Sequence, residues 1–202
     1  DLFRSYEEMP LLEQKALQLA EGKILDVGAG SGCHTLALRK MGKEALAIDI
    51  SPWSVKVMEA RGLTARQVNL FDERFTERFD TILMLMNGSG IIGRLERMGD
   101  FFRRIRQLLN PGGQILMDSS DLRYLFEDED GSYLVNLAGN YYGEIDFRMQ
   151  YKQVKGDSFD WLYVDFDTLS AYAAQCGFRA ECIQEGSHYD YLARLTVTDE
   201  VL

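Results

Sequence analysis

Metal-binding and disulfide-forming side chains are scarce in this sequence, which has two histidines and three cysteines in 202 residues. His34 and His188 stand far apart, and Cys33, Cys176 and Cys182 do not have the spacing of zinc ligands, so we expect no metal site. An odd number of cysteines without close pairing also argues against a disulfide framework. Such a pattern indicates reduced thiols, as in a cytoplasmic protein.

The sequence also lacks long apolar runs and has fewer basic than acidic residues. No segment approaches the roughly 18 apolar residues that a bilayer-spanning helix needs, and no basic stretch followed by an apolar one opens the sequence. The 22 lysines and arginines face 32 aspartates and glutamates, which gives a net charge of −10. Nucleic-acid binders usually carry a basic face. We therefore expect a cytoplasmic protein that binds neither a membrane nor a nucleic acid, while composition leaves the oligomeric state open.

The sequence does contain a regular alternation of strand-like and helix-like segments. Apolar spacing and boundary residues predict helices over residues 10–22, 32–41, 51–62, 94–109 and 166–177. Apolar runs between them predict seven strands, over residues 23–27, 45–49, 65–69, 79–86, 114–118, 178–186 and 189–197. This alternation is typical of an α/β fold with a doubly wound, mostly parallel sheet. We expect its last strand to be antiparallel, and the length suits one domain over residues 1–202.

Residues 122–160 interrupt this alternation. They contain an acidic loop, EDEDG, followed by the stretches YYGEIDFRMQYK and FDWLYVD, which predict an antiparallel pair of strands inserted after the fifth strand. The insert is rich in tyrosine and tryptophan. Two interpretations are open: the aromatic side chains form a lid over an amphipathic substrate pocket, or they pack the inserted strands on the sheet.

The strongest local signal is KILDVGAGSGCHTLAL, residues 23–38, in which an apolar strand runs into three closely spaced glycines before a helix. Turns of this kind cradle nucleotide-bearing cofactors. A nicotinamide-binding fingerprint reads G-x-G-x-x-G, but Cys33 occupies its third glycine position. Asp26 also precedes the turn where such enzymes usually have an apolar residue. The turn alone is a weak signal, and its context decides between cofactor classes.

In this context the sequence resembles the class I S-adenosylmethionine-dependent methyltransferases. LDVGAGSG matches their D/E-x-G-x-G-x-G motif, and Asp49 in AIDIS matches the acidic residue that closes their second strand. LLNPGGQILM is similar to the passage before their fifth strand, and Asn69 in QVNLF stands where the family often has an aspartate. The resemblance covers the chain outside the insert. It implies S-adenosylmethionine as the cofactor and S-adenosylhomocysteine as the product, but it does not specify the acceptor.

The predicted cofactor-binding residues follow the ends of the first four strands: Asp26, Gly28, Ala29, Gly30, Gly32, Asp49, Ile50, Asn69, Leu70 and Met86. Glycines allow a ligand to approach the backbone, and the helix N-terminus behind them offers amides to a carboxylate. Asp49 lies 21 residues after Gly28, a suitable range for binding ribose hydroxyls, and Ile50 can lie against the adenine. The resemblance implies that Asn69 and the Leu70 backbone contact the adenine edge.

Each of these assignments has an alternative. Asp26 could bind nearby backbone amides, Asn69 could be an ordinary turn former, and Asp49 could be a solvated strand end.

The methyl acceptor should bind near the carboxyl ends of the later strands, where ligands of open α/β sheets bind. We expect Asn87, Asp118 and Tyr189 to contact it. A hydroxyl or ammonium acceptor has to lose a proton. The candidate proton acceptors are His188, whose ordinary pKa lies near neutrality, and Asp121. Alternatively, His188 is a surface-turn residue, Asn87 shapes a glycine-rich turn, and the DSSD sequence that ends at Asp121 caps a helix.

The sequence therefore predicts a methyltransferase that uses S-adenosylmethionine to methylate an oxygen or nitrogen atom of a small molecule. The alternatives are a non-catalytic module that binds the same cofactor and a nicotinamide-dependent oxidoreductase. A macromolecular acceptor is a further alternative, since acidic net charge says little about protein substrates.

Overall fold

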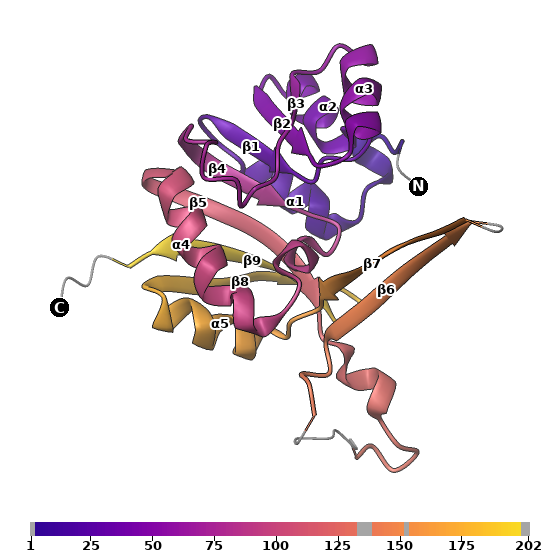
Figure 1. Cartoon of the computed structure of the whole chain (residues 1–202). Helices are drawn as coiled ribbons and strands as arrows, with labels where there is room; N and C mark the ends of the chain where they lie inside the picture. Colours follow the sequence, from indigo (N-terminus) through magenta and orange to yellow (C-terminus); the bar gives the residue numbers. More distant parts are fainter. Residues whose placement is uncertain (1–2, 133–138, 152–153, 199–202) are drawn as a thin grey trace.

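A seven-stranded sheet forms the centre of the computed structural model, which describes residues 3–132, 139–151 and 154–198 (Figure 1). Its strand order is β3-β2-β1-β4-β5-β9-β8. The strands are β1 Ile24–Val27, β2 Ala45–Asp49, β3 Ala65–Gln67, β4 Phe79–Met84, β5 Leu109–Ser120, β8 Phe178–Glu185 and β9 Asp190–Val197. Neighbouring strands from β3 to β5 are parallel, whereas β9 is antiparallel to both β5 and β8. The predicted doubly wound sheet with an antiparallel last strand is confirmed.

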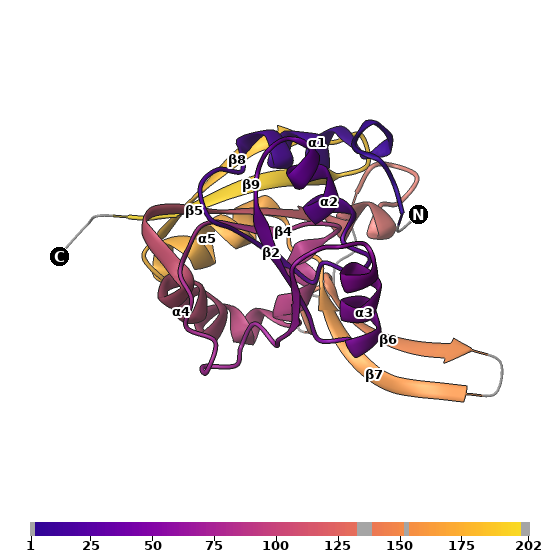
Figure 2. The same cartoon turned by 90° about the horizontal axis from the view of Figure 1, so that it is seen from above.

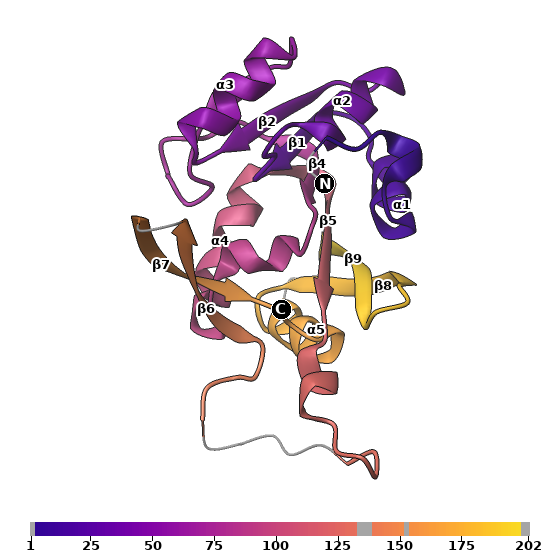
Figure 3. The ribbon, with the colours of Figure 1, turned by 90° about the vertical axis from the view of Figure 1, so that its right-hand side faces the viewer.

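Helices cover both faces of this sheet. The α-helices are α1 Leu11–Leu19, α2 Cys33–Lys40, α3 Pro52–Ala60, α4 Met98–Leu108 and α5 Phe166–Gln175. The 3-10 helices are η1 Tyr6–Glu8, η2 Gly88–Ile92, η3 Leu95–Arg97 and η4 Leu122–Phe126. Figures 2 and 3 show α1 and α4 on opposite sides of the sheet. Within the ranges that the structure describes, no helix is both long enough and apolar enough to cross a membrane.

Because helices lie on both faces, successive side chains of the central strands enter different cores. In β5, Ile115 and Met117 join the core on the side of α4 and α5, whereas Leu116 joins the core on the side of α1 and α2. A strand that is buried on both faces needs apolar residues at consecutive positions. This requirement explains the continuous apolar runs that predict the strands.

Several predicted boundaries differ from the observed ones: the strand predicted over residues 114–118, for example, is β5, which runs from Leu109 to Ser120. Two other differences have identifiable physical reasons. The helix predicted over residues 94–109 begins as an α-helix at Met98, because residues 95–97 form η3. The strand predicted over residues 79–86 ends at Met84, because Met86 and Asn87 adopt left-handed backbone conformations, with φ of 65° and 56°. A left-handed φ cannot continue a strand, so the chain turns away from the sheet at the carboxyl end of β4.

The insert forms a separate two-stranded sheet that projects from the body, and we call its two strands the arm (Figure 1). As predicted, the strands are antiparallel: β6 Glu144–Tyr151 pairs with β7 Val154–Leu162. Phe147 and Phe159 stack at a centroid distance of 5.8 Å and are exposed, so these two rings are not buried against the main sheet. Residues 133–138 and 152–153 of the predicted insert, and residues 1–2 and 199–202 of the predicted domain, lie outside the described residues.

Contacts at the base of the arm attach it to the segment after β4. Arg94 forms an ion pair with Asp160, with Nε and Oδ2 3.0 Å apart. The Trp161 ring lies so close to Gly90 that a Cβ added to this glycine would be 1.8 Å from it. Gly90 belongs to η2, which directly follows the β4 turn. The arm is therefore anchored at the carboxyl edge of the sheet, where the predicted site lies.

Candidate active site

The glycine-rich turn between β1 and α2 lies against the end of β2. The amides of Gly28 and Ala29 donate to the carbonyl of Ile48, at 2.9 and 3.1 Å. The amide of Gly30 donates to Asp49 Oδ2 at 2.9 Å, while the other oxygen of Asp49 accepts from a backbone amide two residues further on. The fold thus brings the turn and Asp49 together.

The glycines of this turn serve two different purposes. Gly28, Gly30 and Gly32 have φ of 66°, 58° and 79°, a region that favours glycine. A Cβ added to Gly32 would lie 2.5 Å from Leu63 Cδ1, so Gly32 allows α2 to pack closely on its neighbours. A Cβ on Gly30 would meet nothing within 4 Å, and one on Gly28 would lie 3.1 Å from Ile91 Cδ1. The space outside Gly30 therefore suits a ligand that approaches the backbone closely, as the implied cofactor does, whereas Ile91 lies against Gly28.

Two of the predicted cofactor-binding residues are exposed apolar side chains beside the turn. Ile50 is 70% exposed and Met86 is 41% exposed. Single exposed apolar side chains are common in proteins, so exposure alone carries little weight. However, Ile50 directly follows β2 and Met86 lies two residues after the end of β4, where ligands of parallel sheets bind. Their position suits contact with a flat, largely apolar ring.

Asp26 and Asn69 already have hydrogen-bond partners within the chain. Asp26 is buried and accepts from Thr35 Oγ1 at 2.7 Å, and burial raises the pKa of its carboxyl group. Asn69 is exposed, and its Oδ1 accepts from the amide of Phe71, which is the bonding of an ordinary turn former. Leu70 is buried. Contacts of Asp26, Asn69 and Leu70 with a cofactor therefore stay predictions.

A buried charge network on the α1 side of the turn was not predicted. Glu13 accepts from Arg4 Nη1 and Nη2 at 3.1 and 2.8 Å, and its Oε2 lies 2.6 Å from His34 Nε2. Burial opposes the charge on His34, but the hydrogen bond with Glu13 and the nearby Asp26 outweigh it and raise the pKa of the imidazole. Burial likewise opposes the charge on Glu13, and the bonds to His34 and Arg4 lower its pKa. The sequence signal was an acidic residue on the apolar stripe of α1.

Arg4 also brings the N-terminal segment against the glycine-rich turn. The charge of Arg4 lowers the pKa of the thiol of Cys33, the first residue of α2, against the burial that raises it. The neighbouring Phe3 ring lies 5.4 Å from the guanidinium of Arg61, which donates to the carbonyl of Ser31 in the turn. The buried Nε atom of Arg4 has no hydrogen-bond partner among the described residues. A buried donor without a partner beside a helix N-terminus fits the carboxylate of an amino-acid-bearing cofactor.

Two predicted acceptor-binding residues, Asn87 and Asp118, are brought together at the ends of β4 and β5. Asp118 is buried, and its Oδ1 accepts from the amide of Gly88 at 3.0 Å. Asn87 Oδ1 accepts from Ser120 Oγ at 2.9 Å. Burial raises the pKa of Asp118 to about 6, although the amides of Gly88 and Asn87 favour its charged form. Polar contacts therefore join the ends of these two strands.

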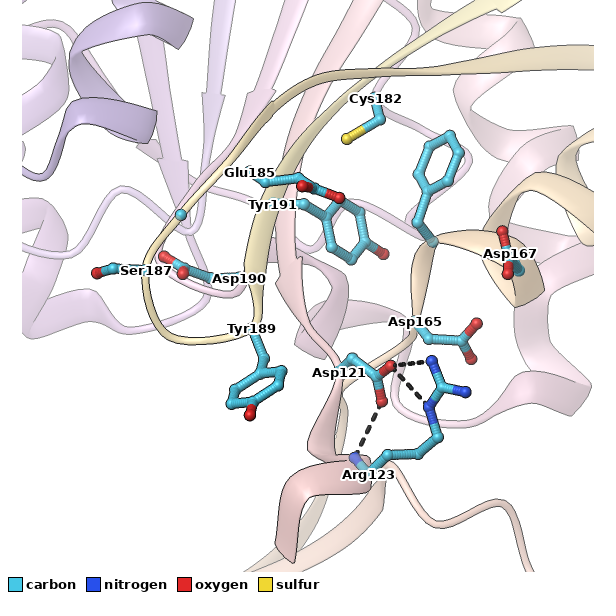
Figure 4. Close-up of a pocket in the computed structure, with 12 residues that line it drawn as sticks. Asp121, Arg123, Asp165, Asp167, Cys182, Glu185, Ser187, Tyr189, Asp190 and Tyr191 are labelled. Atoms are coloured by element: carbon cyan, nitrogen blue, oxygen red, sulfur yellow. Dashed lines mark hydrogen bonds and ion pairs between the residues drawn. The ribbon is translucent and has the colours of Figure 1, made fainter. Parts of the chain in front are cut away.

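A hollow of about 490 Å³ opens at the carboxyl ends of β5 and β8, beside the start of α5 (Figure 4). Acidic and aromatic side chains line it, among them the predicted Asp121 and Tyr189. No residue of the glycine-rich turn lines it, because β5 and β1 are separated by β4 in the sheet. In residues 3–132, 139–151 and 154–198, no group of three or more histidine, cysteine, aspartate or glutamate side chains could hold a metal ion.

The two predicted proton acceptors lie in different surroundings. Asp121 Oδ2 accepts from Arg123 Nε and Nη2 at 2.9 and 2.7 Å (Figure 4). Its Oδ1 accepts from Tyr142 Oη at 2.9 Å. Asp121 also accepts from the amide of Arg123 and so caps η4. His188 is exposed on the turn between β8 and β9, with Nδ1 2.8 Å from Ser187 Oγ.

Several known methyltransferases are similar in sequence to this chain. Residues 25–115 match a family described as a methyltransferase domain. An uncharacterized methyltransferase of Staphylococcus carnosus is 31% identical over 197 residues, which cover 97% of this chain and 87% of that protein. A cypemycin N-terminal methyltransferase of a Streptomyces species is 29% identical over 102 residues, which cover 48% of this chain and 42% of that protein.

A solved structure extends the similarity to three dimensions. It is the crystal structure of an S-adenosylmethionine-dependent methyltransferase from Bacteroides fragilis, in complex with S-adenosyl-L-homocysteine. The two chains are 72% identical with a TM-score of 0.91, and the match covers 98% of this chain and 80% of the other.

Proposed function

This chain belongs to the class I S-adenosylmethionine-dependent methyltransferases, and we propose that it methylates an oxygen or nitrogen atom of a small-molecule acceptor. S-adenosylmethionine is the cofactor. Membership of this family does not favour the nicotinamide-dependent or the non-catalytic alternative. The observation that carries the proposal is the open backbone of Gly30 beside the Asp49 carboxylate.

When bound, S-adenosylmethionine supplies a methyl group that its sulfonium already activates, so the protein mainly has to align the acceptor and exclude water. Asp49 would exchange its bond with the Gly30 amide for ribose hydroxyls. Ile50 and Met86 would flank the adenine, and the backbone near Asn69 would bind its edge.

Opposite the adenine-binding side chains, the cofactor's carboxylate would meet positively polarised groups. Arg4 Nε and the amides at the start of α2 would bind it together.

We propose that the acceptor binds beside the β4 turn, on the side from which the arm projects. The exposed stacked rings of Phe147 and Phe159 support a role for the arm as a lid, since Trp161, which contacts Phe159 edge-on, joins them to Gly90. Tyr189 lies along the same edge of the sheet, further from the cofactor-binding turn. Aromatic surfaces of this kind bind the apolar body of a small molecule.

Proton removal from the acceptor falls to His188 rather than to Asp121. Both oxygens of the Asp121 carboxylate already accept hydrogen bonds, from Arg123 and from Tyr142, so neither is free to bind the acceptor's proton. The His188 ring is exposed, and an imidazole is the side chain that most often acts as a general base. His188 therefore supplies the better general base when the acceptor is an ammonium or an acidic hydroxyl group.

Isothermal titration with S-adenosylmethionine, S-adenosylhomocysteine and NADH tests cofactor binding. We expect both adenosyl ligands to bind and NADH not to bind. Asp49→Ala should weaken adenosyl binding about tenfold or more, because a hydrogen bond to a charged group contributes about 1.5–3 kcal/mol. The control Asp100→Ala, an exposed residue of α4, should bind as the wild type does.

The acceptor is then sought by measuring homocysteine release, through a coupled hydrolase, with panels of phenols, alcohols and primary amines. Turnover with one panel that His188→Gln slows at neutral pH would support the proposal. Binding of NADH alone, or turnover with proteins and with none of the small molecules, would contradict it.

A further inference from the structure

The turn after β4 holds an unfavourable backbone conformation. Met86 and Asn87 are consecutive, and both have positive φ, 65° and 56°. Within the described residues, the other non-glycine residue with positive φ is Tyr189, on the same edge of the sheet. Residues other than glycine adopt this conformation at a cost, and it persists where neighbouring groups enforce it. Some contact must therefore hold the turn.

Two side chains of the neighbouring strand β5 hold this turn. Asp118 Oδ1 accepts from the amide of Gly88 at 3.0 Å, and the amide of Asn87 also favours the charged carboxylate. Ser120 Oγ donates to the side chain of Asn87 at 2.9 Å. Asp118 thus bonds the backbone on the carboxyl side of the two left-handed residues. A charged acceptor makes a hydrogen bond roughly twice as strong as a neutral one does.

The turn lies between the cofactor-binding backbone and the arm. On one side, a Cβ on Gly28 would lie 3.1 Å from Ile91 Cδ1, in the 3-10 helix that the turn begins. On the other side, Gly90 of the same helix contacts Trp161 of the arm. Any shift of the turn would therefore move Met86 and displace contacts on both sides.

We infer that Asp118 is a positioning residue whose ionised carboxylate holds the Met86–Asn87 turn in the conformation that binds the cofactor. This replaces the contact with the acceptor that the sequence suggested for Asp118. The inference rests on the proposed function, because it takes the cofactor to bind beside this turn.

The surroundings of Asp118 give the inference a pH signature. Burial raises the pKa of Asp118 to about 6, while the amides of the β4 turn favour the charged form. The ionisable groups that face Asp118 are Glu13 on α1, His34 on α2 and Tyr191 on β9. Below about pH 6 the carboxyl becomes neutral and holds the turn less strongly, so cofactor affinity should fall. Folding stability should move the other way. A raised pKa favours the protonated form in the folded chain, so the contribution of Asp118 is present at low pH and is lost as pH rises through about 6.

Asp118→Asn separates a positioning role from a merely structural one. Calorimetry with S-adenosylhomocysteine at pH 7.5 should show about fivefold weaker binding than in the wild type, because a neutral acceptor replaces a charged one. The thermal midpoint should be unchanged or higher, because a buried charge has been removed. Between pH 5.5 and 7.5 the wild type should lose affinity toward low pH more steeply than Asp118→Asn does.

A second substitution tests the mechanism, because glycine adopts a left-handed φ at no steric cost. Asn87→Gly added to Asp118→Asn should recover most of the lost affinity. Asp80→Asn, at the amino end of β4, is the matched control and should bind as the wild type does.

If Asp118→Asn binds S-adenosylhomocysteine with the affinity and pH dependence of the wild type, the inference is overturned while the proposed function stands. Loss of binding together with a lower thermal midpoint, without recovery by the glycine, would also overturn it, since that is the signature of a structural role. Absence of S-adenosylhomocysteine binding in the wild type would overturn the proposed function and this inference with it.

Discussion

Replacing Glu13 with glutamine should destabilise the chain far more than most single substitutions. Glu13 is 5% exposed and holds two cationic groups, Arg4 through two hydrogen bonds of 3.1 and 2.8 Å and His34 through a contact of 2.6 Å. Glutamine keeps the shape but removes the charge. Arg4 then stays beside the core without a counter-charge, and His34 loses the partner that raises its pKa.

The magnitude follows from the burial of the three groups. Removing one partner of a buried ion pair typically costs about 3–5 kcal/mol. Arg4 keeps 13% of its side chain in solvent, and His34 can lose its proton, so we expect the lower end, about 3 kcal/mol. For a chain of this length that corresponds to a thermal midpoint lower by roughly 6–12 °C.

The difference in unfolding free energy between the wild type and Glu13→Gln should also depend on pH. The pKa of His34 is raised, so its contribution is full below its ordinary value of 6.5 and is lost as pH rises through the folded value. The pKa of Glu13 is lowered, so its contribution is full above its ordinary value of 4.5 and is lost as pH falls through the folded value. The gap between wild type and variant should therefore be widest between about pH 4.5 and 6.5.

Urea unfolding at pH 5.5, 7 and 9 measures this gap. Glu77→Gln is the control, because Glu77 pairs with exposed Arg66 and Lys23, and surface pairs contribute about 0–1 kcal/mol. A loss below about 1 kcal/mol in Glu13→Gln, or a gap that is constant from pH 5.5 to 9, would refute the reasoning.

Four further substitutions have distinct expected outcomes. Gly90→Ala should push the Trp161 ring and the arm away, and increased protease cleavage of the insert would report this change. Gly99→Ala, where an added Cβ meets nothing within 4 Å, should instead stabilise the chain by about 0.5–1 kcal/mol in urea unfolding. Ile50→Ala should change stability by less than about 0.5 kcal/mol yet weaken S-adenosylhomocysteine binding in calorimetry. Arg104→Met should cost about 2–4 kcal/mol in urea unfolding, because three backbone carbonyls, two of them in buried bonds, lose a charged donor.

The sheet and its order of elements could be predicted because burial on both faces leaves a pattern in neighbouring residues. The glycine-rich turn was equally accessible, since Gly28, Gly30 and Gly32 act through their own backbone conformation. The errors arose where a local pattern competed with a distant contact. The strand predicted to Met86 ends at Met84, because the turn that follows is held by Asp118, some thirty residues later in the chain.

The acidic and basic groups of the site were harder to predict for the same reason. Glu13 and His34 are 21 residues apart, and neither residue alone indicates that they form a buried pair. Asp121 was one of two candidate proton acceptors, and its pairing with Tyr142 depends on where the insert returns to the sheet. The chemistry open to an acidic or basic side chain depends on which groups it is hydrogen-bonded to.

The sequence by itself determined the class of fold, the glycine-rich turn and the acidic residue at the end of β2, because these depend on apolar periodicity and on backbone properties of adjacent residues. Only the tertiary structure decided which charges pair, how the β4 turn is held and where the arm is anchored. Those features depend on free energies of contact between residues far apart in the chain. Such contacts exist only after the helices and strands have packed.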